Sequence, residues 1–323
     1  MPERWLAGLV VVPFLLGAAA APVAESRVAF SFQDSEIVES SGLAVVGGLV
    51  VTTNDSGDTG RVFSVDPATG ETVGVTGWGS EPEDVEALAP LDGNEVWVGD
   101  IGDNTASRTT IQVAPVPVGR GTQDLDGPSY DLVYPDGPHD AETLLADPGT
   151  GRLYVATKGV LGGTLYAAPE TLDPAGPNRL EPVGDVLPIA TDGAFFPDGR
   201  HLVIRSYSMA AVYAFPSMEE VGTFALPSQP QGEGLAVEGA GRLLVSSEGV
   251  HAKVLRVPLP DDLRAVVSPT SSPTPSPAPA TGSREDSELP ETTESQRSAW
   301  PWFLTGLLGI AFILVLTRSL RRR

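Results

Sequence analysis

The sequence repeats one strand pattern five times between residues 26 and 264. Each unit has an acidic or polar pair, a short apolar strand, a turn and a second apolar strand. The first strands are predicted at 41–45, 86–89, 142–145, 192–195 and 233–237. The second strands are predicted at 49–51, 96–98, 153–155, 202–204 and 243–245. Turns rich in Gly, Asp and Asn separate them, which is typical of β-hairpins.

Further strands complete each unit. Third strands are predicted at 62–65, 111–113, 164–166, 211–213 and 253–255. Fourth strands are predicted at 72–75, 130–133, 181–183 and 221–224. The fifth unit lacks a fourth strand, but an unpaired strand at 27–32 precedes the first unit and could complete the fifth.

Units of about 40 to 57 residues with four strands each predict an all-β fold, a β-propeller. We expect five four-stranded blades, closed by the N-terminal strand. No segment of the domain shows helical periodicity. A β-sandwich with similar hairpins is the alternative, and the long second unit leaves room for a sixth blade.

Both ends of the chain predict an exported, anchored protein. Residues 1–21 have the charged start, short apolar core and small-residue exit of a signal peptide, with a buried strand or helix as the alternative. Residues 299–317 are apolar and long enough to cross a bilayer, and a basic tail follows at 318–323. The pattern predicts a single-pass cell-membrane protein with its ectodomain, 26–264, outside.

The segment between domain and anchor, 265–298, is rich in Pro, Ser, Thr and Glu, which predicts a disordered stalk. It contains Leu289-Pro290-Glu291-Thr292-Thr293, which resembles the LPxTG signal that sortases cleave on Gram-positive cell-wall proteins. Thr293 stands where that signal has Gly. Cell-wall attachment is therefore the alternative to a retained helix.

The net charge of the chain limits the classes of partner that it can bind. The chain has 42 acidic and 20 basic residues and no cysteine. This balance argues against nucleic-acid binding and is compatible with bound cations. We expect a monomeric ectodomain that meets an unidentified extracellular ligand or protein, with the membrane contacted through the C-terminal helix.

The first strands of a propeller line its central channel. The aligned position at their start holds Ser41, Glu86, Glu142, Asp192 and Glu233, with Asp84 and Asp140 just upstream. Carboxylates about 8 Å apart repel by roughly 2 kcal/mol per pair at an effective dielectric constant near 20. Such a ring needs a cation, basic partners or protonation. Ca²⁺ would suit these oxygen ligands, and Lys158 and Arg205 follow second strands nearby. The alternative is that the acids cap strands and accept backbone N–H bonds.

Two loops repeat the pattern Asp-x-Gly-Asp after a second strand. They place Asp55 and Asp58 in the first unit, and Asp100 and Asp103 in the second. The repetition makes Ca²⁺ coordination one hypothesis, and ordinary turn chemistry is the other. His139 lies beside Asp140 and Glu142 and is a catalytic or ligand candidate, although a histidine at a strand start is more often structural.

Three segments share short motifs, namely Asp84–Leu88, His139–Leu144, and Gln231–Leu235 followed by Ser246–Gly249. They resemble blades of bacterial phytase-like propeller proteins, the family named for the esterase-like activity of phytase. The resemblance implies an acidic channel that binds Ca²⁺, with basic groups, here Lys158 and Arg205, on a phosphate.

Two functions follow as hypotheses. The first is a non-enzymatic binding module with Ca²⁺ or a small ligand at the channel mouth. The second is a metal-dependent hydrolase of phosphoester or lactone substrates, with Lys158 or Arg205 on the substrate. Whether the chain is an enzyme stays open at this point, since the sequence lacks a nucleophile elbow, an H-E-x-x-H motif and a P-loop.

Overall fold

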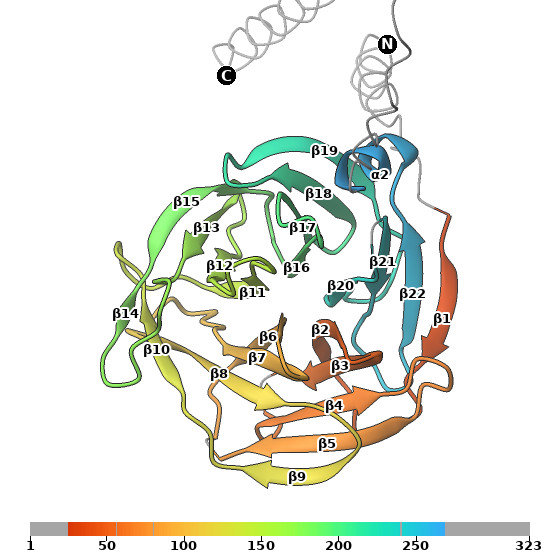
Figure 1. Cartoon of the computed structure of the whole chain (residues 1–323), viewed down its shortest axis with the longest axis horizontal. Helices are drawn as coiled ribbons and strands as arrows, with labels where there is room; N and C mark the ends of the chain where they lie inside the picture. Colours follow the sequence, from red (N-terminus) through yellow and green to blue (C-terminus); the bar gives the residue numbers. More distant parts are fainter. Residues whose placement is uncertain (1–24, 56, 80, 240, 269–323) are drawn as a thin grey trace, which may run out of the picture. The chain divides into compact units, whose positions relative to one another are not determined.

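The computed structural model describes residues 25–268 except 56, 80 and 240. These residues form a ring of five β-sheets around a central axis (Figure 1). The predicted signal segment, sorting motif and membrane span lie outside them. Within them, no helix has both the length and the apolar character needed to cross a membrane.

Each sheet is one blade, numbered here in chain order. Blade 1 contains β2 (Ser40–Val46), β3 (Leu49–Asn54), β4 (Arg61–Val65) and β5 (Thr72–Trp78). Blade 2 contains β6 (Val85–Leu91), β7 (Glu95–Asp100), β8 (Ile111–Pro117) and β10 (Tyr130–Val133). Blade 3 contains β11 (Ala141–Ala146), β12 (Leu153–Thr157), β13 (Gly163–Ala167) and β15 (Glu181–Val186). Blade 4 contains β16 (Asp192–Phe195), β17 (His201–Arg205), β18 (Met209–Ala214) and β19 (Glu219–Ala225).

Blade 5 joins the two ends of the domain. It contains β20 (Leu235–Val237), β21 (Arg242–Val245), β22 (Lys253–Pro258) and β1 (Arg27–Ser31). The N-terminal strand β1 pairs antiparallel with β22, with Ser31 opposite Lys253. The prediction of five blades closed by the N-terminal strand is confirmed.

Three elements were not expected from the repeat. β9 (Gly121–Leu125), from the long second unit, pairs in parallel with β5 of blade 1. β14 (Asn178–Arg179), from the third unit, pairs in parallel with β10 of blade 2. A short helix, α2 (Asp261–Val267), follows β22. The short helix was not predicted and runs across the predicted domain boundary at 264, and the extra length of the second unit forms an added strand instead of a sixth blade.

The hydrophobic core lies between blades. Five apolar clusters fill the five joints of the ring, and each draws its side chains from two neighbouring sheets. First strands such as β2 and β11 are therefore buried along almost their whole length. Outer strands such as β15 and β19 are largely exposed. This gradient explains why the first two strands of each unit are the most apolar.

The closing strand should contribute strongly to stability. Phe32 follows β1, is fully buried, and packs edge-to-face on Phe30 in the joint between blades 5 and 1. Replacing a buried aromatic ring with alanine costs about 3–5 kcal/mol of unfolding free energy. We expect Phe32→Ala to show that loss in urea denaturation. Val28→Ala is the control, because Val28 lies on the same strand but is half exposed; equal losses would contradict closure through Phe32.

Candidate functional site

The start of each first strand is where the ring turns polar side chains toward its axis. The first strands of adjacent blades lie next to one another around the centre (Figure 1). In blades 1, 2 and 3 the pairing of the first two strands slips at the aligned position, so Ser41, Glu86 and Glu142 stand outside the regular ladder. Such bulges redirect side chains. We call this end of the axis the acidic mouth.

Three carboxylates converge at the acidic mouth. Asp55 follows β3 in blade 1, Asp84 precedes β6 in blade 2, and Glu86 lies on β6. One carboxylate oxygen from each lies within 4.8 Å of the other two. Asp55 and Asp84 are partly buried and Glu86 is buried. We call these residues the carboxylate triad.

Asp84 is positioned by Asp100, the last residue of β7, and by the loop that follows β7. The carboxylate of Asp100 accepts the backbone N–H groups of Glu83 and Asp84 at 3.0 and 2.9 Å. Arg108 donates to Asp100 at 2.8 Å and is almost fully buried. Gly102 leaves the space that the triad occupies, since a Cβ there would lie 2.4 Å from Asp84 Oδ2 and 2.9 Å from Glu86 Cγ.

Glu86 is the buried member of the triad. Its Oε2 lies 2.9 Å from the hydroxyl of Ser41, which also reaches the Glu86 carbonyl oxygen at 2.8 Å. Burial, and then the neighbouring charge of Glu142, raise the pKa of Glu86 to about 10. Burial and the charges of Asp55 and Asp140 raise the pKa of Asp84 to about 6. A bound cation would reverse both shifts.

Glu142 lies beside the triad and pairs with Lys158. Lys158 donates to Glu142 Oε1, and its ammonium lies 5.7 Å from the centre of the Tyr207 ring. The other oxygen, Oε2, is buried and has no hydrogen-bond partner within the described part of the chain. Burial raises the pKa of Glu142 to about 7, although Lys158 opposes the shift.

A second carboxyl pair lies across the mouth in blade 5. Glu233 is buried, and Glu248 makes a side-chain hydrogen bond to it. Burial and then the charge of Glu248 raise the pKa of Glu233 to about 9. Two carboxyl groups in such contact hold one proton between them at neutral pH.

Asp192 has a structural environment. It is fully buried, and its Oδ2 accepts the backbone N–H groups of Leu43 in blade 1 and Leu235 in blade 5, at 3.2 and 2.6 Å. Its Oδ1 accepts the N–H of Gly193 at 2.8 Å. Burial raises the pKa of Asp192, while these bonds and the nearby charge of Arg205 oppose the shift. This is the backbone-bonding role that the sequence left as the alternative.

Arg205 is also enclosed. Its side chain is fully buried and donates to the carbonyl oxygens of Gly234 and Ser246, at 2.9 and 3.3 Å. Burial lowers its pKa to about 10. A side chain in that position cannot touch a ligand at the mouth. Arg205 therefore joins blades 4 and 5, and of the two basic candidates only Lys158 faces the acidic cluster.

The two Asp-x-Gly-Asp loops are not structurally equivalent. By strand register, Asn54 and not Asp55 corresponds to Asp100, because Asn54 pairs with Ser40 as Asp100 pairs with Val85. Asn54 accepts the N–H groups of the two residues before β2, as Asp100 does before β6.

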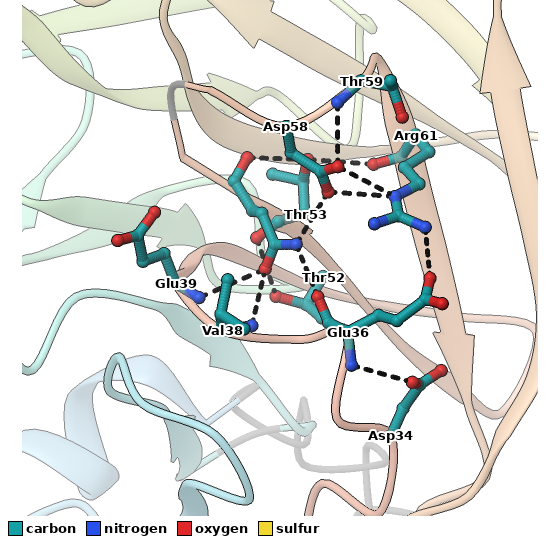
Figure 2. A network of polar contacts seen from close by, with 10 residues as sticks. Asp34, Glu36, Val38, Glu39, Thr52, Thr53, Asp58, Thr59 and Arg61 are labelled. Carbon is teal, nitrogen blue, oxygen red and sulfur yellow. Dashed lines mark hydrogen bonds and ion pairs between the residues drawn. The ribbon is translucent and has the colours of Figure 1, made fainter.

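The remaining acids of these loops bond to residues within or beside the loops. Asp58 binds Arg61 and Asn54 in a polar network that extends to Glu36 (Figure 2). Asp103 accepts the N–H groups of Ser107 and Arg108 at 2.9 and 2.8 Å. Asp140 accepts the N–H of Asp103 at 2.9 Å. Of the four loop acids named in the sequence, Asp55 alone enters the triad.

His139 lies in a separate cluster. Its Nε2 is 3.1 Å from Asp136, whose carboxylate also accepts the hydroxyl of Tyr166 at 2.9 Å. The ring of Tyr134 packs edge-on against both His139 and Tyr166. The cluster braces the joint between blades 2 and 3. Sequence reasoning missed Tyr207 and Glu248 at the mouth, and both follow a second strand, as Asp55 and Lys158 do.

Comparison with known proteins adds little about chemistry. No protein-family model and no curated protein sequence matches the chain. A gluconolactonase from Xanthomonas campestris is similar in structure, with a TM-score of 0.45 and 13% identity over 76% of this chain and 93% of that one. The Myxococcus xanthus glutaminyl cyclase gives 0.46 and 14% over 73% and 97%. At this level the likeness says nothing about the mouth, and the phytase-like resemblance stays a prediction.

Asp192 should be essential to the axis. Asp192→Ala leaves two inter-blade N–H groups buried without their acceptor, and an unsatisfied buried donor costs about 1–3 kcal/mol, so we expect a loss of about 2–5 kcal/mol in unfolding free energy. Asp185→Ala is the control: Asp185 is exposed on β15, and such changes fall within about 0.5 kcal/mol. A loss no larger than the control's, measured by urea denaturation, would show that the carboxylate does not join the blades.

Glu233 should make stability depend on pH. Its pKa rises from 4.5 to about 9 on folding, so the folded state binds the proton more tightly. The resulting stabilisation is full below about pH 4.5 and is lost as the pH rises toward 9. Thermal melts of Glu233→Gln should therefore improve relative to the unaltered chain between pH 5 and 9. A constant difference across that range would contradict the raised pKa.

Proposed function

We propose that the acidic mouth binds one divalent cation, Ca²⁺ foremost, through Asp55, Asp84 and Glu86. The convergence of these three carboxylates from two blades is the observation that carries the proposal. Ca²⁺ takes six to eight oxygen ligands at 2.3–2.6 Å. Two ligands on opposite sides of the ion are then about 4.6–5.2 Å apart, so oxygens within 4.8 Å of one another can share one ion.

The surroundings fit a cation. Gly102 keeps the space behind Asp84 and Glu86 free of a side chain. The buried Oε2 of Glu142 lacks a hydrogen-bond partner among the described residues, and Glu142 is the strongest charged neighbour of Glu86. A positive ion would satisfy this excess of negative charge, and water would complete its coordination.

The biological role that we propose is a surface-displayed binding module. The cation would hold a ligand at the mouth, between the triad and the side chains of Lys158 and Tyr207. Display outside the cell rests on the sequence signals at 1–21 and 299–317, and the stalk at 265–298 would hold the domain away from the membrane. Monomeric behaviour and an extracellular partner belong to the same proposal.

Hydrolysis of a phosphoester or lactone is the second candidate. Glu142 favours it, because its pKa of about 7 suits a group that exchanges protons near neutral pH. Lys158 holds one of its oxygens, and the other is buried without a hydrogen-bond partner among the described residues. A bound cation would supply charge stabilisation for a polarised ester. In this scheme Glu142 moves the proton and Lys158 orients it.

Calcium titration tests the proposed site. At a Ca²⁺ concentration about 100-fold above Kd, stabilisation is about 2.7 kcal/mol, or a rise in Tm of roughly 5–10 °C. Glu86→Gln should lower the affinity at least about 10-fold by removing a charged ligand. Gly102→Ala should do so by displacing Asp84. Asp92→Asn is the control, because Asp92 is exposed at the other end of β6. No Ca²⁺-linked shift in the unaltered chain would refute the site.

Activity assays separate the two functions. The full chain with Ca²⁺ is offered p-nitrophenyl phosphate and a γ-lactone, and Glu142→Gln is assayed beside it. Turnover that falls at least about 100-fold in Glu142→Gln would establish the hydrolase. Ca²⁺ binding without turnover of either substrate would leave the binding module.

A further inference from the structure

The opposite end of the axis contains a cavity that the proposed function does not use. It has a volume of about 420 Å³ and is lined by residues from the first strands of all five blades. These residues come one or more positions after the aligned starts of their strands, for example Leu43 after Ser41 and Leu88 after Glu86. None of the triad residues lines it. We call this end the apolar mouth.

The floor of the cavity is closed toward the acidic mouth. A Cβ on Gly42 would lie 2.6 Å from the backbone nitrogen of Leu88, so β2 and β6 are already in contact there. A Cβ on Gly234 would lie 3.0 Å from Leu43 Cβ, which brings blade 5 equally close. Asp192 bonds across the same level of the axis. A molecule in the cavity therefore lies on the far side of this layer from the cation.

Small residues leave the space open. Its wall includes Ala146 of blade 3, Ala194 of blade 4 and Ala236 of blade 5, beside leucines such as Leu43, Leu88 and Leu144. A larger side chain in place of one of these alanines would reduce the cavity.

The wall is lined mostly by apolar residues, and its polar side chains are those of Asp92, Asp147 and Thr150. Asp147 lines it, but its carboxylate already accepts the N–H of Gly149 and the hydroxyl of Thr150, both at 2.8 Å. Asp92 is exposed at the edge. None of the buried polar side-chain atoms without a partner in the described residues belongs to this wall. The buried part of a bound molecule would therefore meet mainly apolar side chains.

We propose that the apolar mouth binds a small apolar molecule, such as a fused aromatic ring system or a short hydrocarbon chain. The volume lies in the range of small-molecule sites, about 300–1,000 Å³. Apolar cavities of about 150 Å³ bind benzene, so this one has room for two or three fused rings. The site is independent of the cation, and its occupant would be held by contact area alone.

Equilibrium dialysis with naphthalene tests the site on the full chain. We expect about one molecule bound per chain in excess of two blocked variants, Ala194→Phe and Ala146→Phe. Both alanines are only partly buried, so a ring can be accommodated. Ala68→Phe, at an exposed turn, is the control and should bind as the unaltered chain does. All chains are kept in the same detergent. Partition of naphthalene into the detergent micelles is then equal in every sample and cancels when the chains are compared.

Two results would overturn the proposal. One is naphthalene binding that is equal in the unaltered chain and in both blocked variants. The other is a dimer, seen by sedimentation, that the blocked variants lose while naphthalene fails to bind, since a second copy would then cover this mouth. The Ca²⁺-dependent rise in Tm should persist in Ala194→Phe and Ala146→Phe. If the unaltered chain shows no Ca²⁺-dependent rise in Tm, the cation site is refuted, whereas the proposal for the apolar mouth is not affected.

Discussion

The carboxylate of Asp192 joins three blades at one point. A propeller blade normally contacts only its two neighbours, but Asp192 in blade 4 accepts backbone N–H groups from blades 5 and 1. These bonds draw the first strands together until glycine is required at Gly42 and Gly234. The same closeness crowds the acids that begin those strands. The raised pKa values of Glu86 and Glu233 are therefore a consequence of how tightly the axis is packed.

The same five strands produce two unlike mouths. At the starts of the first strands of blades 1, 2 and 3, bulges turn polar side chains inward, and carboxylates gather with too little positive charge to balance them. A few residues later the strands are regular and their axial side chains are small or aliphatic. A ring fold separates these environments by a layer only one or two residues thick. One mouth suits a charged ligand and the other an apolar one.

Much of the ring could be predicted from sequence, because each strand has an apolar core position and each hairpin a turn signal. The parallel strands β9 and β14 could not, since Gly121–Leu125 is fully exposed and has no apolar alternation. α2 is too short for helical periodicity. At the mouth, the aligned position correctly gathered Glu86 and Glu142. It could not distinguish Asp192, whose partners are backbone N–H groups that include those of Leu43 in blade 1 and Leu235 in blade 5. The Asp-x-Gly-Asp repeat aligned Asp55 with Asp100, which is wrong by one residue. Asn54 is the structural equivalent of Asp100, because its hydrogen bonds depend on the strand register.

The added elements make the joints of the ring unequal. β9 carries blade 2 onto the edge of blade 1, and β14 carries blade 3 onto the edge of blade 2. α2 leads from blade 5 onto blade 4, where Leu263 lies against Gly222. Among the described residues, neither strand pairing nor a helix crosses the joint between blades 3 and 4 in this way. If the ring opens locally before it unfolds, that joint is the seam, and blades 1 to 3 would separate from it as one cooperative unit.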